Sequence, residues 1–342
     1  MTGPDRSRRP NRVTLEDVAH AAGVSRATAS RVIAGYGSVS PETTDLVNAT
    51  AARLGYTPDA VGRALAGGTG FRLVVAVTGT TPSVLDDPYV HRVVGSAAAV
   101  CAPHGVGVSL HWLPYHSPAE LGTLAQDRGV RGVILVNTTD QVLDAVPAGM
   151  AGRVASIGVG SPTVPSFDVD TACFTTAMVH HLYASGRRRI AMVSGPTWLP
   201  CTWRAVAAYR AAMQAAGLPA RHLPGDFTAA GGSAATATVL SRWPDTDAVL
   251  ASSDAMALGA IAALRKRSFD VPGDVAVAGF DDHPLSPLVA PPLTSVSWDT
   301  AAAAAAAAEM LVGAIDEGVT AGEVVVPPRL RPRRSTAAQP RA

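Results

Sequence analysis

The sequence predicts two units, a small all-α unit at residues 13–58 and a larger α/β unit with two parallel sheets at residues 71–336. The first is predicted because short helical patterns follow one another at glycine turns before residue 60. The second is predicted because strand-like and helical runs alternate after residue 70, which favours parallel strands joined by helical crossovers. About 260 residues are more than one such sheet usually needs, so two sheets are expected.

The composition is that of a globular protein with one basic end. Of the 342 residues, 47% are hydrophobic and 16% are charged, and the formal net charge is only +1. Residues 6–34 nevertheless hold six arginines against the two acidic residues Glu16 and Asp17. A basic front end on a nearly neutral body suits a unit that meets phosphate groups.

Several classes of protein are disfavoured by the sequence. The three cysteines, Cys101, Cys173 and Cys201, are scattered, so neither a zinc site nor a disulfide framework is expected. The N-terminus is polar and lacks the apolar core of a signal peptide, and no run of about 18 apolar residues suggests a membrane span. The alanine run 301–308 is too short to span and favours a helix. A cytoplasmic protein without metal or cofactor is expected.

The first two helices are predicted from their caps. Thr14 can cap the first helix, with Asp17 three residues later in the position of a capping box. Gly23 ends that helix, and Ser25 can cap a second helix at residues 26–34. The first helix carries one apolar stripe at helical spacing, formed by Leu15, Val18, Ala19 and Ala22. Two short helices joined by a tight glycine turn are typical of a helix-turn-helix unit.

The second helix begins with small and polar side chains, namely Arg26, Ala27, Thr28, Ser30 and Arg31. Such a helix fits the major groove of DNA, where its N-terminal residues meet base edges. Capped short helices around an Ala-Gly turn also occur in proteins that do not bind DNA. From the pattern alone, DNA binding and a purely structural role both remain open.

Two further helices are predicted before the linker. Ser40 caps the third, Pro41 fits its first position and Gly55 ends it. Its inner face is expected to comprise Leu46, Val47, Thr50 and Leu54. A fourth helix at residues 58–66 is followed by two glycines, and it is short enough that it should need a partner to fold.

Two runs, VTLEDVAHAAGVSRATASRVIAG and VSPETTDLVNATAARLGYTPDAVGRAL, resemble the head and hinge of the LacI/GalR family of repressors. The resemblance implies a transcriptional regulator, acting as a homodimer on a near-palindromic double-stranded DNA operator. It places the hinge at residues 58–70, where a leucine, here Leu65, wedges into the minor groove. The implied DNA-binding residues are Thr14, Ser25, Arg26, Ala27, Thr28, Ser30, Arg31, Tyr56, Arg63 and Leu65.

Three positions depart from the family pattern in this region. Ala29 stands where valine is usual, Ala34 where an asparagine near the phosphates is usual, and Asp59 where asparagine is common. Ala29 reduces packing, Ala34 removes a hydrogen bond and Asp59 adds a negative charge near the DNA. Together these changes are expected to weaken DNA binding. The arginine-rich tail at residues 6–12 would partly offset this loss through phosphate contacts.

The larger unit shows seven strand-like runs with helical stretches between them. The predicted strands are Leu73–Val77, Gly107–Trp112, Gly132–Val136, Val154–Val159, Ile190–Ser194, Ala248–Ala251 and Val275–Phe280. The predicted helices lie near residues 89–103, 118–128, 171–185, 202–216, 231–241 and 254–267. Ligands of open α/β sheets bind at the carboxyl ends of the strands, so two facing sheets predict a cleft there.

The segments GRRRIAMVSGP, DAVLASSDAMALGAIAALR, VPGDVAVAGFDDHPLSPLVAPPLTSV and RLRPRRST resemble the effector domain of the same family. That domain is similar to periplasmic sugar-binding proteins and closes around a small effector, a sugar or a related metabolite. The implied effector-binding residues are Asp87, Tyr89, Arg204, Phe227, Ser253 and Asp281. Two bland alternatives stay open, because Asp281 or Asp282 could only cap a loop and Phe227 could only fill the core.

One departure bears on the ligand. The family arginine falls at Ala205, and Arg204 precedes it by one residue, which on a helix is a rotation of about 100°. Either Arg204 still reaches the cleft or the anchor is lost. Trp198 and Trp203 are candidates for new walls, and Ala208 replaces a family glycine. The ligand class could therefore differ from a simple sugar, or ligand control could be absent.

The sequence gives little support for an enzyme. The sequence contains no G-x-S-x-G elbow, no H-E-x-x-H and no P-loop pattern. His180 and His181 are adjacent on a helix and point in different directions, which disfavours a shared metal. Three hypotheses remain: an effector-controlled regulator, a DNA-binding regulator without ligand control, and a sugar-binding protein or α/β enzyme. The segment 13–66 argues against the third.

Overall fold

The structure is a computed structural model that describes residues 13–34, 39–56, 71–313, 323–326 and 329–337. The chain divides into two compact units, Met1–Phe71 and Arg72–Ala342. They are called the head and the body below, and each is treated by itself. Within the described ranges, every helix is too short or too polar to cross a bilayer.

The head contains three helices, α1 (Leu15–Ala21), α2 (Arg26–Ala34) and α3 (Pro41–Leu54). The capping box is present, because the Thr14 side chain accepts from the Asp17 backbone and the Asp17 carboxylate accepts from the Thr14 backbone at 2.8 Å. Gly55 ends α3 in the left-handed conformation at φ 67°, which glycine adopts without strain. A small core lies between the helices and centres on Val18, Ala29 and Val47.

One residue of the third helix's inner face was predicted incorrectly. Leu46 is 51% exposed, whereas Val47 and Thr50 are buried and Leu54 is partly buried against the head core. Ala51, which was not predicted, is buried with them. The predicted helix at 58–66, with Asp59, Arg63 and Leu65, and the arginine tail at 6–12 lie outside the described residues.

The first lobe of the body is built on a sheet of six strands. In space they follow the order β11 (Glu323–Val326), β5 (Ser166–Val169), β4 (Val154–Ile157), β3 (Val130–Val136), β1 (Arg72–Gly79), β2 (Gly107–Pro114). Every pairing in this sheet is parallel. Helices α5 (Pro88–Cys101) and α12 (Thr300–Val312) pack on one face, and α6 (Glu120–Gln126) and α7 (Asp140–Asp144) on the other.

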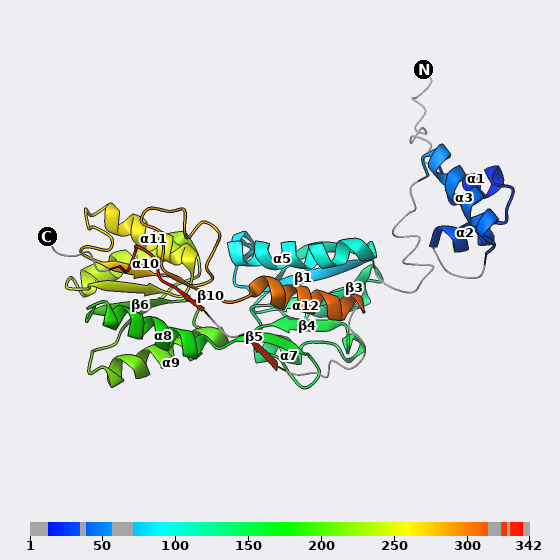
Figure 1. The fold of residues 1–342 in the computed structure, drawn as a ribbon. Helices are drawn as coiled ribbons and strands as arrows, with labels where there is room; N and C mark the ends of the chain where they lie inside the picture. Colours follow the sequence, from blue (N-terminus) through cyan, green and yellow to red (C-terminus); the bar gives the residue numbers. More distant parts are fainter. Residues whose placement is uncertain (1–12, 35–38, 57–70, 314–322, 327–328, 338–342) are drawn as a thin grey trace, which may run out of the picture. The chain divides into compact units, whose positions relative to one another are not determined.

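The second lobe has a four-stranded parallel sheet. Its spatial order is β7 (Arg221–Pro224), β6 (Ile190–Ser194), β8 (Ala248–Ala251), β9 (Ala276–Ala278). Helices α8 (Thr171–Ala184) and α9 (Pro200–Ala215) cover one face, while α10 (Ala229–Arg242) and α11 (Asp254–Arg265) cover the other. The predicted pair of parallel sheets is therefore confirmed, and Figure 1 shows the helical layers around each sheet.

Strands buried on both faces explain the long apolar runs in the sequence. Leu73, Val75 and Val77 on β1 face α5 and α12, whereas Val74 and Ala76 face α6 and α7. Because both faces are covered, these strands are apolar throughout rather than alternating with polar residues.

The chain crosses between the lobes more than once. It leaves the first sheet after β5, returns through β10 (Ser295–Ser297) into α12, and pairs β12 (Arg329–Arg331) with β10 in an antiparallel ladder. The two lobes are thus joined by more than one connecting segment, an arrangement that allows one lobe to rotate relative to the other.

Gly259 on α11 lies against the backbone of α10 at Ala229, where an added Cβ would clash with the carbonyl oxygen. We expect Gly259→Ala to lower the free energy of unfolding by about 1–3 kcal/mol, because backbone cannot move aside as a side chain can. Gly122→Ala on α6 is the matched control, since nothing lies within 4 Å of its Cβ position. That change should stabilise the protein by about 0.5–1 kcal/mol. Urea denaturation of both variants checks the pair, and equal effects would contradict the close packing.

Candidate functional sites

A cavity lies between the two sheets of the body. It is reached by the segments that follow β4, β8 and β9, which contribute Gly158, Ser252 and Phe280 among others. All six effector-site residues named from the sequence line this one cavity: Asp87, Tyr89, Arg204, Phe227, Ser253 and Asp281. The cavity therefore stands where parallel sheets ordinarily bind ligands.

Asp87 and Tyr89 enter from the first lobe. Asp87 caps α5, and its Oδ1 accepts a hydrogen bond from the Tyr89 backbone nitrogen at 2.9 Å. Burial raises the pKa of Asp87 to about 6, against the opposing effect of that hydrogen bond. The Tyr89 ring packs against Trp298 with centroids 5.9 Å apart. Both side chains thus belong to the wall of the cavity.

Asp281 enters from the second lobe, directly after β9. Its backbone has φ 96°, a conformation that is uncommon for residues other than glycine. Trp298 Nε1 lies 3.4 Å from Asp281 Oδ1, and the Arg92 guanidinium donates to the Asp281 backbone oxygen at 3.0 Å. Burial raises the pKa of Asp281 well above its usual value, and the charges of Asp254 and Asp87 raise it further.

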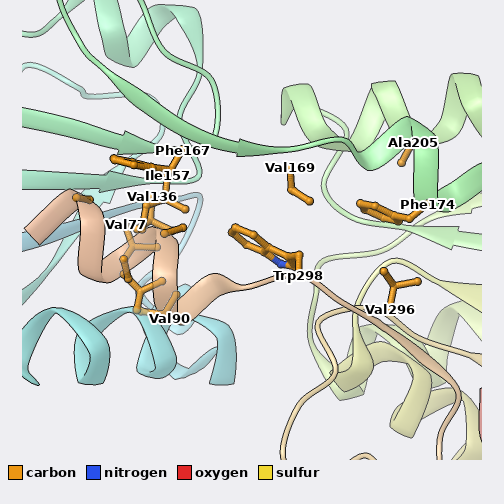
Figure 2. Close-up of a cluster of buried hydrophobic side chains, with 14 of the residues drawn as sticks. Val77, Val90, Val136, Ile157, Phe167, Val169, Phe174, Ala205, Val296 and Trp298 are labelled. Atoms are coloured by element: carbon orange, nitrogen blue, oxygen red, sulfur yellow. The ribbon is translucent and has the colours of Figure 1, made fainter. Parts of the chain in front are cut away.

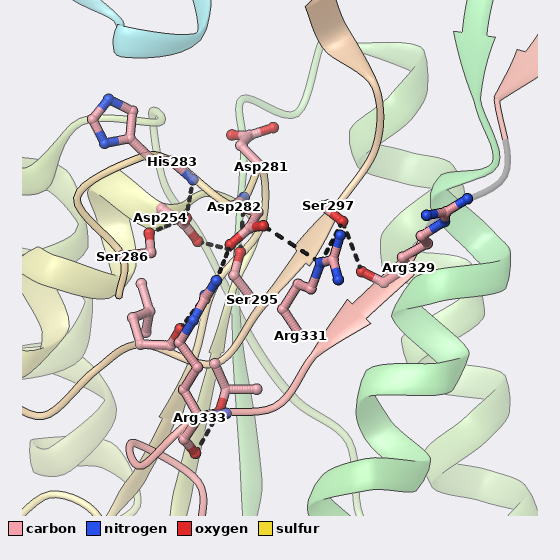
Figure 3. Close-up of polar contacts among 12 residues, drawn as sticks. Asp254, Asp281, Asp282, His283, Ser286, Ser295, Ser297, Arg329, Arg331 and Arg333 are labelled. Carbon is pink, nitrogen blue, oxygen red and sulfur yellow. Dashed lines mark hydrogen bonds and ion pairs between the residues drawn. The ribbon is translucent and has the colours of Figure 1, made fainter. Parts of the chain in front are cut away.

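Asp281 and Asp282 differ in their contacts. Asp282 pairs with Arg333 at 2.5 Å and lies 3.7 Å from Arg331, so it ties the turn to the C-terminal segment. Figure 3 shows the Asp281 carboxylate pointing away from these arginines. Asp282 is therefore the residue that holds this loop, whereas Asp281 lines the cavity.

Asp254, next to the predicted Ser253, organises the same turn. Its carboxylate accepts from the His283 backbone at 2.8 Å, from Ser286 Oγ at 2.5 Å and from Ser295 Oγ at 2.6 Å. Burial raises the pKa of Asp254 to about 6, although these hydrogen bonds oppose the shift. The network, drawn in Figure 3, holds the loop that presents Asp281.

Ser253 and Phe227 combine lining with structural contacts. The Ser253 hydroxyl caps α11 by accepting from the Met256 backbone at 3.2 Å, and it lies 3.4 Å from the Phe227 carbonyl oxygen. Phe227 is partly buried against the core of the second lobe and has φ 67°. Its ring occupies the space that a side chain at Gly195 would need. Both residues therefore shape the cavity wall as well as line it.

Arg204 reaches the cavity from α9. Its Nη2 lies 2.7 Å from Asp168 Oδ2, and the side chains are 28% and 3% exposed respectively. Asp168 belongs to β5 of the first lobe, so the ion pair spans the two lobes. Ala205 also lines the cavity and is buried. The sequence left open whether Arg204 reaches the cavity, because the family arginine falls at Ala205. In the structure Arg204 lines the cavity.

Aromatic side chains form much of the remaining wall. Phe174 and Phe280 stack with centroids 4.2 Å apart, and Trp298 is 4% exposed. Figure 2 shows Trp298 and Val169 between the apolar groups of the two lobes. Sequence reasoning missed Asp168, Phe174, Phe280 and Trp298.

The two tryptophans suggested as new walls do not line the cavity. Trp203 is 58% exposed, and Trp198 stacks on Tyr115 with centroids 4.5 Å apart. Tyr115 follows β2 in the first lobe and Trp198 precedes α9 in the second. This aromatic pair therefore bridges the lobes outside the cavity.

In the head, the predicted recognition residues lie along α2. Ser25, Arg26, Ala27 and Arg31 are exposed, Thr28 and Ser30 are half-buried, and Ala29 is buried in the core. Ser25 Oγ accepts from the Thr28 backbone at 3.0 Å, so its hydroxyl caps the helix. Thr14 is exposed at the start of α1, and Tyr56 packs against the head core. The helix thus presents one polar, positively charged face.

In the described part of the chain, no three His, Cys, Asp or Glu side chains come together to form a metal site.

A helix-turn-helix head with an exposed basic helix, followed by a two-lobed body around a cavity, is the architecture of a DNA-binding protein that also binds a ligand. Two family models match: "Bacterial regulatory proteins, lacI family" over residues 14–59, and "Periplasmic binding protein-like domain" over residues 179–336.

Comparison with individual proteins agrees. The chain is 34% identical to the HTH-type transcriptional regulator CelR of Thermobifida fusca, covering 95% of this chain and 96% of that protein. A lac repressor dimer bound to operator and the anti-inducer ONPF superimposes with a TM-score of 0.81 at 27% identity, over 96% of this chain and all of that chain. A CelR–cellobiose complex gives 0.66 at 30% identity, with 96% and 100% coverage. The chain belongs to the LacI family of bacterial transcriptional regulators.

Proposed function

We propose that this regulator represses transcription as a homodimer on a near-palindromic operator, and that a small effector in the inter-lobe cavity changes its hold on DNA. The observation that carries the proposal is that the six effector-site residues implied by the family resemblance, which are far apart in sequence, line that one cavity. In this proposal residues 13–58 bind DNA, residues 58–70 form the hinge, and residues 71–336 bind the effector and form the dimer. The lac repressor structure, a dimer on operator DNA with a small molecule, supports this scheme.

On DNA, α2 is proposed to lie in the major groove. Its exposed Arg26 and Ala27 would meet base edges, while Ser25, Thr28, Ser30 and Arg31 would position the helix. Thr14 and Tyr56 would contact the sugar-phosphate backbone of the DNA. Arg63 and Leu65, in the hinge at residues 58–70, would contact the minor groove. A dimer places two such helices on two half-sites, which is why the operator should be an inverted repeat.

Control by the effector is proposed to act through the angle between the lobes. A ligand that touches Asp87 and Asp168 from the first lobe and Arg204 and Asp281 from the second binds one arrangement of the lobes best. A change of that angle alters the spacing of the two hinges in the dimer. Both sites then bias the same two-state element, as coupling between sites requires.

The effector itself is proposed to be a sugar or a related metabolite. Carboxylates and an arginine suit hydroxyl groups, and the aromatic walls suit the apolar side of a ring. The CelR–cellobiose complex supports the class. A regulator without ligand control is less favoured, because Arg204 still reaches the cavity. No catalytic activity is expected, and the site of action is the cytoplasm, at the nucleoid.

Selection of bound duplexes from a random pool tests the proposal. The purified protein at near-physiological salt is expected to enrich an inverted repeat, which by family likeness should carry a central C-G step. Binding that shows no enriched repeat and vanishes as salt rises would leave only phosphate attraction and would contradict sequence-specific regulation.

We expect Arg26→Ala to weaken binding to the selected operator by about 10–100-fold, since one good base contact contributes about 1–3 kcal/mol. The readout is fluorescence anisotropy with a labelled operator and with a scrambled duplex. Arg53→Ala is the matched control, because Arg53 is an exposed arginine near the end of α3 and not on the recognition helix α2. Equal losses for the two variants would remove Arg26 from base recognition.

A further inference from the structure

The distribution of charge in the cavity narrows the effector class. We propose that the effector carries one protonated amine on a ring, and that Asp87 and Asp281 hold this amine between them. The inference rests on the proposed function, since it takes the inter-lobe cavity as the effector site.

The cavity has more acid than base. Its lining includes three carboxylates, those of Asp87, Asp168 and Asp281, and Arg204 is the one basic side chain among the described lining residues. Arg204 is committed to Asp168 at 2.7 Å. Two carboxylates are thus left in one cavity without a basic side chain of their own in the lining.

Neither of these two carboxylates is saturated by hydrogen bonds within the described residues. Asp87 accepts one, from the Tyr89 backbone to Oδ1. Asp281 accepts one long contact of 3.4 Å from Trp298 to Oδ1. Arg92, the nearby cation, donates to the Asp281 backbone oxygen rather than to the carboxylate. Each carboxylate keeps acceptor capacity for a ligand donor.

A second observation points to a ligand in the same place. Thr202 lines the cavity, is 3% exposed, and has a buried hydroxyl oxygen with no hydrogen-bond partner in the described structure stronger than the weak contact of the neighbouring Cys201 thiol. Arg204 Nε is likewise buried and unpaired. Buried polar atoms of this kind are costly unless something hydrogen-bonds to them, so a polar ligand group beside the amine is expected.

The walls suit a cation as well as a ring. Tyr89 and Trp298 lie with centroids 5.9 Å apart beside the two carboxylates, and Phe174 and Phe280 stack nearby. Aromatic faces attract ammonium groups through the ring quadrupole, most strongly where water is excluded. A neutral sugar would use the same faces, so the charge on the ligand is what distinguishes the two classes.

The pKa shifts of the two carboxylates agree with this assignment. Burial raises the pKa of Asp87 to about 6 and that of Asp281 well above its ordinary value, and the charge of Asp87 contributes to the shift at Asp281. Buried carboxylates that repel each other bind a proton more tightly than free carboxylates do. An ammonium group between them would favour loss of such a proton, whereas a neutral ligand would not.

The test uses the full-length protein and pairs of probes that differ in charge: glucosamine and glucose, galactosamine and galactose, cyclohexylamine and cyclohexanol. Calorimetry in buffers of different ionisation enthalpy measures affinity and proton release. We expect an ammonium probe to bind about tenfold or more tightly than its neutral partner and to release a proton. Asp87→Asn should abolish this preference, while Asp144→Asn, an exposed carboxylate on α7, should leave it unchanged.

Two results would overturn the proposal: neutral partners that bind as tightly as the amines, or no ammonium probe that binds at about 10 mM. Operator binding by the same samples separates this outcome from the proposed function. A protein that binds its operator and responds to a neutral sugar keeps the proposed function and loses the amine. A protein that enriches no operator loses the proposed function whatever the amines do.

Discussion

Replacing Arg204 by alanine is expected to lower the free energy of unfolding by about 3 kcal/mol and to remove the effector response. Asp168 is only 3% exposed and pairs with Arg204 at 2.7 Å, so the variant leaves a carboxylate buried without its partner. Removing one member of a buried ion pair typically costs about 3–5 kcal/mol, and the partial exposure of Arg204 places the estimate at the lower end. Urea denaturation, extrapolated to water, measures the change.

The double variant Arg204→Met with Asp168→Leu is the control for this prediction. Apolar replacement of both partners removes the uncompensated charge, so most of the lost stability should return while the effector response stays absent. A single Arg204→Ala variant within about 0.5 kcal/mol of the wild type would contradict the account, since changes of that size are usual at exposed positions without contacts.

Asp281→Asn is expected to leave operator affinity unchanged while weakening effector binding by about 100-fold. The carboxylate faces the cavity and carries no ion pair with the C-terminal arginines, which bind Asp282 instead. A hydrogen bond from a charged group contributes about 1.5–3 kcal/mol, and the amide cannot accept at both positions. The measurement is operator release, followed by anisotropy, across an effector titration.

Asp144→Asn serves as the control here too, because it removes an exposed carboxylate that does not line the cavity. A normal effector response in Asp281→Asn would exclude Asp281 from the site. Loss of operator binding by Asp281→Asn would instead assign the residue to the fold.

The head was predictable because its signals are local. A cap, a proline or a glycine marked the beginning and end of α3, and α2 began and ended at the predicted residues Arg26 and Ala34. The exception is the buried face of α3, where Leu46 is exposed. Local pattern fixes the ends of a helix more firmly than the burial of each residue on it, because burial depends on the partner helices.

In the described part of the body, the seven predicted strands are present, but β5, β7, β10, β11 and β12 were missed. Each of these has only three or four residues, and β5 carries Asp168 in its middle, a residue type that is depleted in strands. The partner of Arg204 was missed with it, because the ion pair joins elements 36 positions apart in sequence. Trp298 was missed for the same reason, since no local pattern places a tryptophan between two lobes.

The position of Arg204 could not be predicted from helix rotation alone. Leu199, Pro200, Cys201, Thr202, Arg204 and Ala205 all line the cavity. They include much of the first turn and a half of α9, so the helix meets the cavity with its N-terminal end. At a helix end neighbouring positions can reach the same space, and a rotation of about 100° matters less than it does along the side of a helix.

The measurement that tests the central claim most directly is operator affinity with the two lobes chemically bridged. Tyr115 and Trp198 stack across the lobes at 4.5 Å, so cysteines at these positions can be joined by a short bifunctional thiol reagent. Cys173, which is exposed, and Cys201, which is partly exposed, are replaced by serine. If the lobe angle controls DNA binding, bridging should change operator affinity by about tenfold or more, without changing affinity for scrambled DNA. Single-cysteine variants treated with the same reagent control for its attachment. Equal operator affinity before and after bridging would contradict control through the lobes.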